Sequence, residues 1–141
     1  MTQDQIRAVK ESWAKVETLD PIAVGGLFYT RLFEIMPELA SMFRSPIPEQ
    51  SKKLIAMISY VIHKLDRLDS ILDEVGRLAE RHVQYGVKNE HYTVVGGALL
   101  WTLEKGLGSE WNEQLKECWG ICYQLLSDAM IQAGERSSRA A

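Results

Sequence analysis

The fold of this chain is decided by residues 78–87, which read LAERHVQYGV. The stretch completes a stripe of apolar side chains at helical spacing, formed by Ile71, Val75 and Leu78. His82 takes the next position on that stripe, where the pattern asks for a core aliphatic residue, on the last turn of a helix that ends near Gly86. Neutral imidazole is the commonest metal ligand. A lone histidine on an apolar face is also commonly a core residue with a satisfied hydrogen bond, so this stretch alone leaves both interpretations open.

The composition is that of an ordinary globular domain. The chain has 141 residues, which suits one domain with a single core, and 46% are hydrophobic and 25% charged. A net charge of −3, with neither sign clustered, does not indicate nucleic acid or an anionic membrane as a partner. No apolar run approaches the roughly 20 residues of a transmembrane helix, and the N-terminal stretch lacks the apolar segment of a signal peptide. We therefore expect a cytoplasmic protein.

Two cysteines, Cys118 and Cys122, lie four residues apart in a helical pattern. Helix neighbours at this spacing are about 5–6 Å apart at Cβ, whereas a disulfide requires about 3.5–4.5 Å. The two cannot pair in an intact helix, and no further cysteine or nearby histidine completes a metal site with them. We interpret both as small core residues, which suits a reducing compartment.

Helical periodicity extends along the chain, and no strand-type alternation of useful length occurs. The first helix begins with a capping box over residues 2–5, and Asp20 caps a second helix that has Pro21 at its first position. Pro37 opens a short helical turn, a polar break is expected over residues 66–70, and Ser109 is expected to cap the last helix. The predicted buried positions, in chain order, are Ile6, Val9, Trp13, Val16, Ile22, Tyr29, Phe33, Leu54, Ile58, Val61, Leu65, Tyr92, Val95, Leu99, Leu103, Trp111, Leu115, Cys118, Trp119, Cys122, Leu126 and Met130.

These elements predict an all-α domain over residues 1–133, followed by a tail, residues 134–141, that lacks apolar side chains and should fray. Packing rules allow a bundle or an arrangement of crossed helices. Gly25 and Gly26 lie inside the second helix at a cost of about 1 kcal/mol each relative to alanine, which is explained if another helix crosses there closely. Two prolines also force a loop at residues 44–48. Both features favour crossed helices.

Three polar side chains fall on or near predicted buried faces: Gln50, Tyr29 and Tyr92. The first two lie within about 40° of the apolar faces of their helices. An unpaired buried phenol or amide costs roughly 1–3 kcal/mol, so each needs a partner. Each can bond a backbone carbonyl, or all three can point with His82 into one pocket for a small polar ligand. The other two histidines, His63 and His91, are expected at the surface.

Several motifs, in their order and spacing, resemble the globin family over essentially the whole chain. The likeness is greatest to bacterial single-domain globins and to the haem domain of flavohaemoglobins. The resemblance implies the globin fold, with crossed helices around a haem pocket. The matching pieces are residues 28–33 (FYTRLF), 36–43 (MPELASMF), 50–54 (QSKKL), 81–87 (RHVQYGV), 91–96 (HYTVVG) and 118–120 (CWG).

The resemblance implies a haem b group (iron protoporphyrin IX) between the Leu54 helix and the His82 helix. His82 matches the proximal iron ligand, and Phe43 matches a residue that stacks on the porphyrin. Tyr29, Gln50 and Leu54 match distal positions that contact O₂ or another diatomic gas, with Tyr29 and Gln50 as the ligand-stabilising hydrogen-bonding groups. Lys53 matches a position that often meets a haem propionate. The remaining proximal and edge contacts fall on Leu78, Val87, Tyr92 and Val95.

The sequence departs from related globins at two places. Most vertebrate-type globins carry a distal histidine where this chain has Gln50, and glutamine is a poor iron ligand. A six-coordinate resting state formed by that side chain is therefore not expected. In flavohaemoglobins a glutamate and a tyrosine form hydrogen bonds around the proximal histidine. Tyr92 matches the tyrosine, but the place of the glutamate falls on Gly134, with Glu135 beside it, so the resemblance does not extend to that carboxylate.

The resemblance implies a protein that binds O₂ reversibly, and also NO and CO, for storage or delivery. One alternative is NO dioxygenation, in which O₂ oxidises NO to nitrate and an external reductase restores ferrous iron. A haem-based gas sensor and a haem-free structural globin fold are the others, and His82, Phe43, Tyr29 and Gln50 argue against the last. We expect no flavin module, nicotinamide module or output domain in a chain of 141 residues. A monomer or homodimer is expected, without nucleic acid or membrane as a partner.

Overall fold

The protein is all-helical, as predicted. The computed structural model describes residues 1–140, of which residues 137–140 are described by their backbone only. No strand occurs in this part of the chain, and none of its helices has the length and apolar character that crossing a membrane requires. The elements are α1 (Gln3–Val16), α2 (Pro21–Ile35), η1 (Pro37–Met42), α3 (Ile47–His63), η2 (Leu65–Ile71), α4 (Leu72–Gln84), α5 (Asn89–Leu107), η3 (Gly108–Glu110) and α6 (Glu113–Ala140), where η marks a 3-10 helix.

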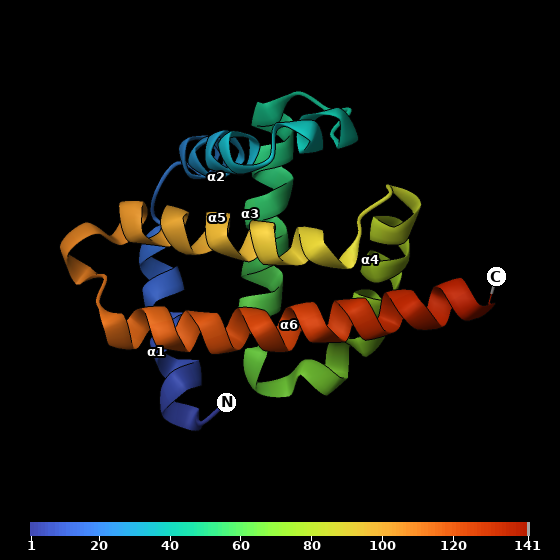
Figure 1. Cartoon of the computed structure of the whole chain (residues 1–141). Coiled ribbons are helices and arrows are strands. Elements are labelled where there is room, and N and C mark those ends of the chain that lie inside the picture. Colours follow the sequence, from blue (N-terminus) through green and yellow to red (C-terminus); the bar gives the residue numbers. More distant parts are fainter. Residues whose placement is uncertain (141) are drawn as a thin grey trace.

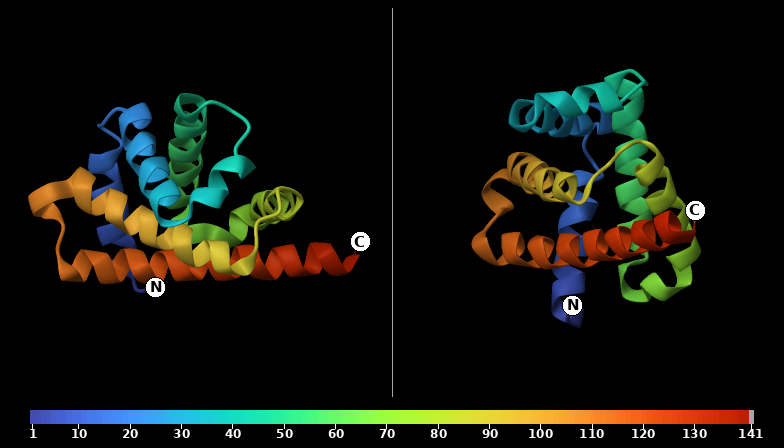
Figure 2. Two further views of the ribbon diagram at one scale, coloured as in Figure 1. Left: turned by 45° about the horizontal axis from the view of Figure 1, so that its top comes forward. Right: turned by 45° about the vertical axis from the view of Figure 1, so that its right-hand side comes forward.

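The helices cross one another steeply. α5 and α6 run side by side, while α1 and α3 lie across them (Figure 1, Figure 2). α2 packs on α3 and α5, and α4 packs on α6. Among the described residues α4 has no comparable packing against α3, although η2 joins the two helices. This is the crossed-helix arrangement that the sequence favoured.

The core has one large cluster around two tryptophans. The Trp13 and Trp119 rings lie 5.9 Å apart, and their indole N–H groups donate to Ser59 Oγ at 3.0 Å and Ser12 Oγ at 2.8 Å. Each buried tryptophan therefore has the partner that its polar nitrogen needs. The predicted core role of the two cysteines is confirmed. The other buried members of the cluster are Val9, Val16, Val24, Ile62, Leu65, Leu103, Leu107, Cys118 and Cys122.

Two predicted helix starts are confirmed and one is wrong. Thr2 and Gln5 form the expected capping box, and Asp20 Oδ1 accepts the Ile22 N–H at 3.0 Å. Ser109 does not cap the last helix, because the chain makes the extra turn η3 first. Asn112 has that role: its Oδ1 accepts the Leu115 N–H at 2.8 Å.

Two predicted side-chain positions are corrected by the structure. Ile22 is 38% exposed, because α2 turns a neighbouring face inward, formed by Val24, Gly25, Phe28, Tyr29 and Leu32. His91 is buried, since its Nδ1 accepts the Lys88 N–H at 3.0 Å and this bond turns the ring inward. His63 is at the surface as predicted, with Nε2 3.2 Å from Glu17 Oε1.

The polar break predicted at residues 66–70 is part of η2, so the chain keeps a helical turn there. At the C-terminal end, α6 runs without interruption through the expected domain boundary at residue 133. Gly134 is buried and a Cβ there would lie 3.1 Å from Val83 Cγ2. The sequence predicted fraying over residues 134–141. Of these, residues 137–141 lie outside the fully described part of the chain.

Gly25 allows the close crossing of α2 and α3. A Cβ built on it would overlap Cβ and Oγ of Ser51, which is itself fully buried. Nothing lies within 4 Å of a Cβ built on Gly26. The predicted close crossing is therefore confirmed at the first glycine only.

We expect Gly25→Ala to lower the free energy of unfolding by about 1–3 kcal/mol, because the added methyl forces α2 and α3 apart. Gly26→Ala is the matched control. It should raise the free energy of unfolding by up to about 1 kcal/mol, since alanine loses less backbone entropy than glycine in a helix. Urea unfolding measures both, and a Gly25→Ala protein as stable as Gly26→Ala would contradict this account of the crossing.

Candidate haem-binding site

His82 is held in one orientation on the last turn of α4. Its Nδ1 lies 2.8 Å from the carbonyl oxygen of Leu78, one turn earlier in the helix. A carbonyl can only accept, so Nδ1 carries the proton and Nε2 keeps its lone pair in the neutral ring. Burial lowers the pKa of His82, opposed by this hydrogen bond and assisted by Arg81. The half-buried imidazole is thus neutral near pH 7, and no described residue bonds its Nε2.

Tyr92 lies against His82 from the first turn of α5. The two rings are nearly parallel, with 19° between their planes and 6.4 Å between their centroids. Burial raises the pKa of the Tyr92 phenol. Val87 and Tyr92 line a cavity of about 330 Å³ that Met130 and Gly134 of α6 also border. The structure therefore brings the ring of Tyr92 to His82, and Tyr92 also shares a cavity with Val87.

A second group of predicted residues forms an apolar cluster between α2, α3 and α5. Tyr29, Phe43, Leu54 and Val95 all belong to it. Tyr29 is 4% exposed, and its ring meets that of Phe43 edge-on at 5.1 Å. Burial raises the pKa of Tyr29 to about 12, while hydrogen bonding to Gln50 acts in the opposite direction. The buried phenol keeps its proton at neutral pH and is a hydrogen-bond donor.

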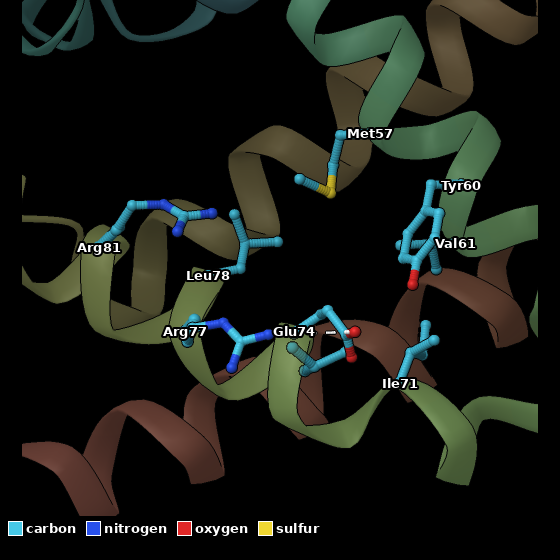
Figure 3. Close-up of a pocket in the computed structure, with 9 residues that line it drawn as sticks. Met57, Tyr60, Val61, Ile71, Glu74, Arg77, Leu78 and Arg81 are labelled. Atoms are coloured by element: carbon cyan, nitrogen blue, oxygen red, sulfur yellow. Dashed lines mark ion pairs between the residues drawn. The ribbon is translucent and has the colours of Figure 1, made fainter.

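Between α3 and α4 lies a mostly apolar cavity of about 180 Å³. Met57 from α3 and Leu78 from α4 extend into this space from its two sides (Figure 3). Arg77 and Arg81 of α4 add charged side chains to its wall, and Arg77 Nη2 lies 4.0 Å from Glu74 Oε1. Met57 was not singled out from the sequence, although its spacing of three residues from Leu54 places it on the same helix face.

The predicted site residues thus occupy three places: the cluster around Tyr29, the cavity that Leu78 lines, and the surroundings of His82. Neither the 180 Å³ cavity nor the 330 Å³ cavity is lined by all three groups. Gln50 is half-buried on α3, and Lys53 is exposed without an ion pair to another described residue.

The chemistry of these side chains fits a haem group. Haem requires a strong axial donor in an apolar environment that controls access to the iron. His82 offers a neutral, oriented imidazole, because its other nitrogen is engaged with Leu78. The apolar side chains Met57 and Leu78 face the space between two helices that do not pack closely on each other.

Known proteins resemble this chain along most of its length. The family model described as Globin matches residues 26–130. A flavohemoprotein of Chromobacterium violaceum is 30% identical over 135 residues, which cover 93% of this chain and 33% of that protein. The chain therefore spans about a third of the flavohemoproteins it matches. An anaerobic nitrite reductase of Gossypium hirsutum is 33% identical over 145 residues, covering 92% of this chain and 91% of the relative.

Solved structures share the helix arrangement. A bacterial globin from Campylobacter jejuni is 25% identical with a TM-score of 0.86, covering 98% of this chain and 99% of that one. An engineered carbene transferase from Rhodothermus marinus is 22% identical with a TM-score of 0.88, covering 99% of this chain and 97% of that one. At that identity the second likeness concerns the fold alone. With the family model matched over residues 26–130, from within α2 to within α6, the chain belongs to the globin family.

Proposed function

We propose that this chain is a haem b protein that binds O₂ reversibly, with His82 as the proximal iron ligand. The observation that carries the proposal is the hydrogen bond from His82 Nδ1 to the Leu78 carbonyl. Such a bond fixes the tautomer and the ring direction of a ligating histidine and raises its basicity. When bound, the haem would supply an iron that coordinates a diatomic gas, O₂, NO or CO.

On the distal side the proposal assigns Tyr29 and Gln50 to the gas. The Tyr29 phenol is buried and protonated, so it can donate a hydrogen bond, while Gln50 either donates as well or holds the phenol. Phe43 would stack on the porphyrin, and the exposed Lys53 would meet a propionate. Apolar contacts with the haem would come from Leu54, Leu78, Val87 and Val95, with Tyr92 behind the proximal histidine.

NO dioxygenation with a separate reductase is the second candidate. It is supported by the likeness of the chain to flavohemoproteins. The likeness to the flavohemoproteins extends over a third of their length, so it concerns one part of those proteins.

Absorption spectra of the ferric, ferrous and O₂-exposed ferrous protein, followed by addition of NO, test both candidates. A Soret band and a stable oxygenated spectrum support reversible O₂ binding, and purified protein without a Soret band would overturn the proposal. Rapid loss of the oxygenated spectrum with one nitrate formed per haem shows that the dioxygenation chemistry is available. Sustained turnover with an added reductase would establish an enzyme.

Without a gas, the ferrous protein should be mainly five-coordinate near neutral pH. The Gln50 amide is a poor ligand, and Tyr29 remains a protonated phenol because its pKa is about 12. The absorption spectrum of the dithionite-reduced protein at pH 7 measures the coordination. Sharp low-spin bands there would mean that a protein side chain reaches the iron from the distal side.

A further inference from the structure

We infer that Tyr123 of α6 is a positioning residue for His82 that acts through Tyr92. The inference rests on the proposed function, in which His82 binds the iron. The Tyr123 hydroxyl donates a hydrogen bond to the main-chain carbonyl of Tyr92 at 2.5 Å, although the two residues are 31 positions apart. Tyr123 therefore ties α6 to the first turn of α5, the turn that carries the ring stacked on His82.

Gly96 provides the room that this contact needs. A Cβ built on Gly96, one turn after Tyr92, would lie 2.6 Å from Cε2 of Tyr123. The phenol ring thus lies directly on the backbone of α5 while its hydroxyl reaches the preceding turn. Gly97 has nothing within 4 Å of its Cβ position, so the close approach is confined to the first of the two glycines.

The Tyr123 hydroxyl is also a permanent donor. Burial raises the pKa of this phenol, and the neighbouring Tyr92 raises it further. A tyrosine that does not ionise keeps its hydrogen bond to the Tyr92 carbonyl across the physiological pH range. The carbonyl has two lone pairs, so it can accept this bond beside the ordinary helix bond.

The helix packing explains why the position of Tyr92 depends on α6. α4, which carries His82, and α5, which carries Tyr92, each pack on α6, but in the described structure they do not pack extensively on each other. Besides the short link between them, residues 85–88, α6 is therefore the neighbour that α4 and α5 share, and their packing on it bears on the distance of 6.4 Å between the His82 and Tyr92 rings. Of the described side chains of α6, Tyr123 makes the hydrogen bond that reaches this turn of α5.

The test compares wild type with Tyr123→Phe, which keeps the ring and removes the hydroxyl. Ser127→Ala is the matched control, because the Ser127 hydroxyl bonds the Gln124 carbonyl of its own helix at 3.2 Å. The readouts are the His82 ring resonances by NMR in the ferrous CO-bound protein, the iron–histidine stretch of the ferrous protein by resonance Raman, and the rate of haem loss. We expect Tyr123→Phe to shift the first two and to speed haem loss about fivefold, the factor for one lost hydrogen bond. Ser127→Ala should leave all three as in wild type.

A second pair of variants tests the same contact from α5. Gly96→Ala should displace the Tyr123 ring and change the His82 signals, whereas Gly97→Ala should not. Lower thermal stability of Tyr123→Phe with unchanged His82 resonances and an unchanged iron–histidine band would overturn the inference and leave Tyr123 a purely structural role. Wild-type protein that binds no haem would overturn the proposed function instead. The His82 resonances of haem-free wild type and haem-free Tyr123→Phe would then be compared. A difference between them would support the positioning role of Tyr123, and identical resonances would overturn it.

Discussion

Replacing His82 by alanine should give a protein that purifies with almost no haem. The change removes the oriented imidazole on α4, whose Nε2 is the free nitrogen of a ring held by the Leu78 carbonyl. Axial ligation by one histidine is a common way for a protein to hold haem iron, and no other described group combines these features. The ratio of Soret to protein absorbance after purification measures the loss.

His63→Ala is the matched control for this variant. His63 is exposed and its Nε2 lies beside the Glu17 carboxylate, so its removal should leave the haem content unchanged. Adding imidazole to His82→Ala should restore part of the haem binding, because the small molecule replaces the missing ligand. A His82→Ala protein with full haem and the wild-type ferrous spectrum would show that another residue binds the iron.

Replacing Tyr29 by phenylalanine should weaken O₂ binding by roughly 10- to 150-fold. Bound O₂ has partial negative charge on its outer atom, and a phenol that donates to it forms a charge-assisted bond worth about 1.5–3 kcal/mol. Each 1.4 kcal/mol corresponds to about tenfold in the equilibrium constant. The phenol is buried with a pKa of about 12, so it remains a donor at neutral pH. Most of the loss should appear as faster dissociation, since entry of the gas does not require the bond.

Carbon monoxide is the internal control for Tyr29→Phe, because it is less polar when bound and gains less from a donor. Dissociation rates of O₂ and CO should be measured for Tyr29→Phe, Gln50→Leu and the double variant. Equal acceleration for both gases would mean that the substitution opened the pocket. Unchanged O₂ release in Tyr29→Phe would mean that the phenol points elsewhere. Non-additive effects in the double variant would place Gln50 and Tyr29 in one hydrogen-bonded unit.

The helices could be predicted because local signals determine them. Apolar periodicity, the Thr2 capping box and the Asp20-Pro21 start all act within a few residues, and each appears in the structure. The cap predicted at Ser109 is wrong, because the capping residue of a helix depends on where the preceding turn ends. The extra 3-10 turn η3 moves the cap of α6 to Asn112. On α2 the predicted burial of Tyr29 is confirmed and that of Ile22 is wrong. A helix of nearly uniform apolarity does not indicate where the edge of its buried face lies.

The identity of the site residues could be proposed from sequence, but their connections could not. His82 was conspicuous as a polar residue on an apolar stripe, whereas its Leu78 partner appears only once the imidazole has an orientation. The contact between Gly96 and Tyr123 joins residues on two helices, and no local pattern relates them. His91 was predicted at the surface but is buried. The hydrogen bond that its ring accepts from the Lys88 N–H turns the side chain inward, and the sequence does not indicate this bond.

Helix α4 has one fully buried residue, Ala79, and it packs on α6 while its other side faces the space toward α3. Segments with so little burial open at low free-energy cost, and opened segments are the ones that proteases cut. A ligand held by His82 would add its binding energy to the folding of this helix. The lifetime of the chain in a cell would then follow the supply of haem, so that its abundance could fall under iron limitation at a constant rate of synthesis.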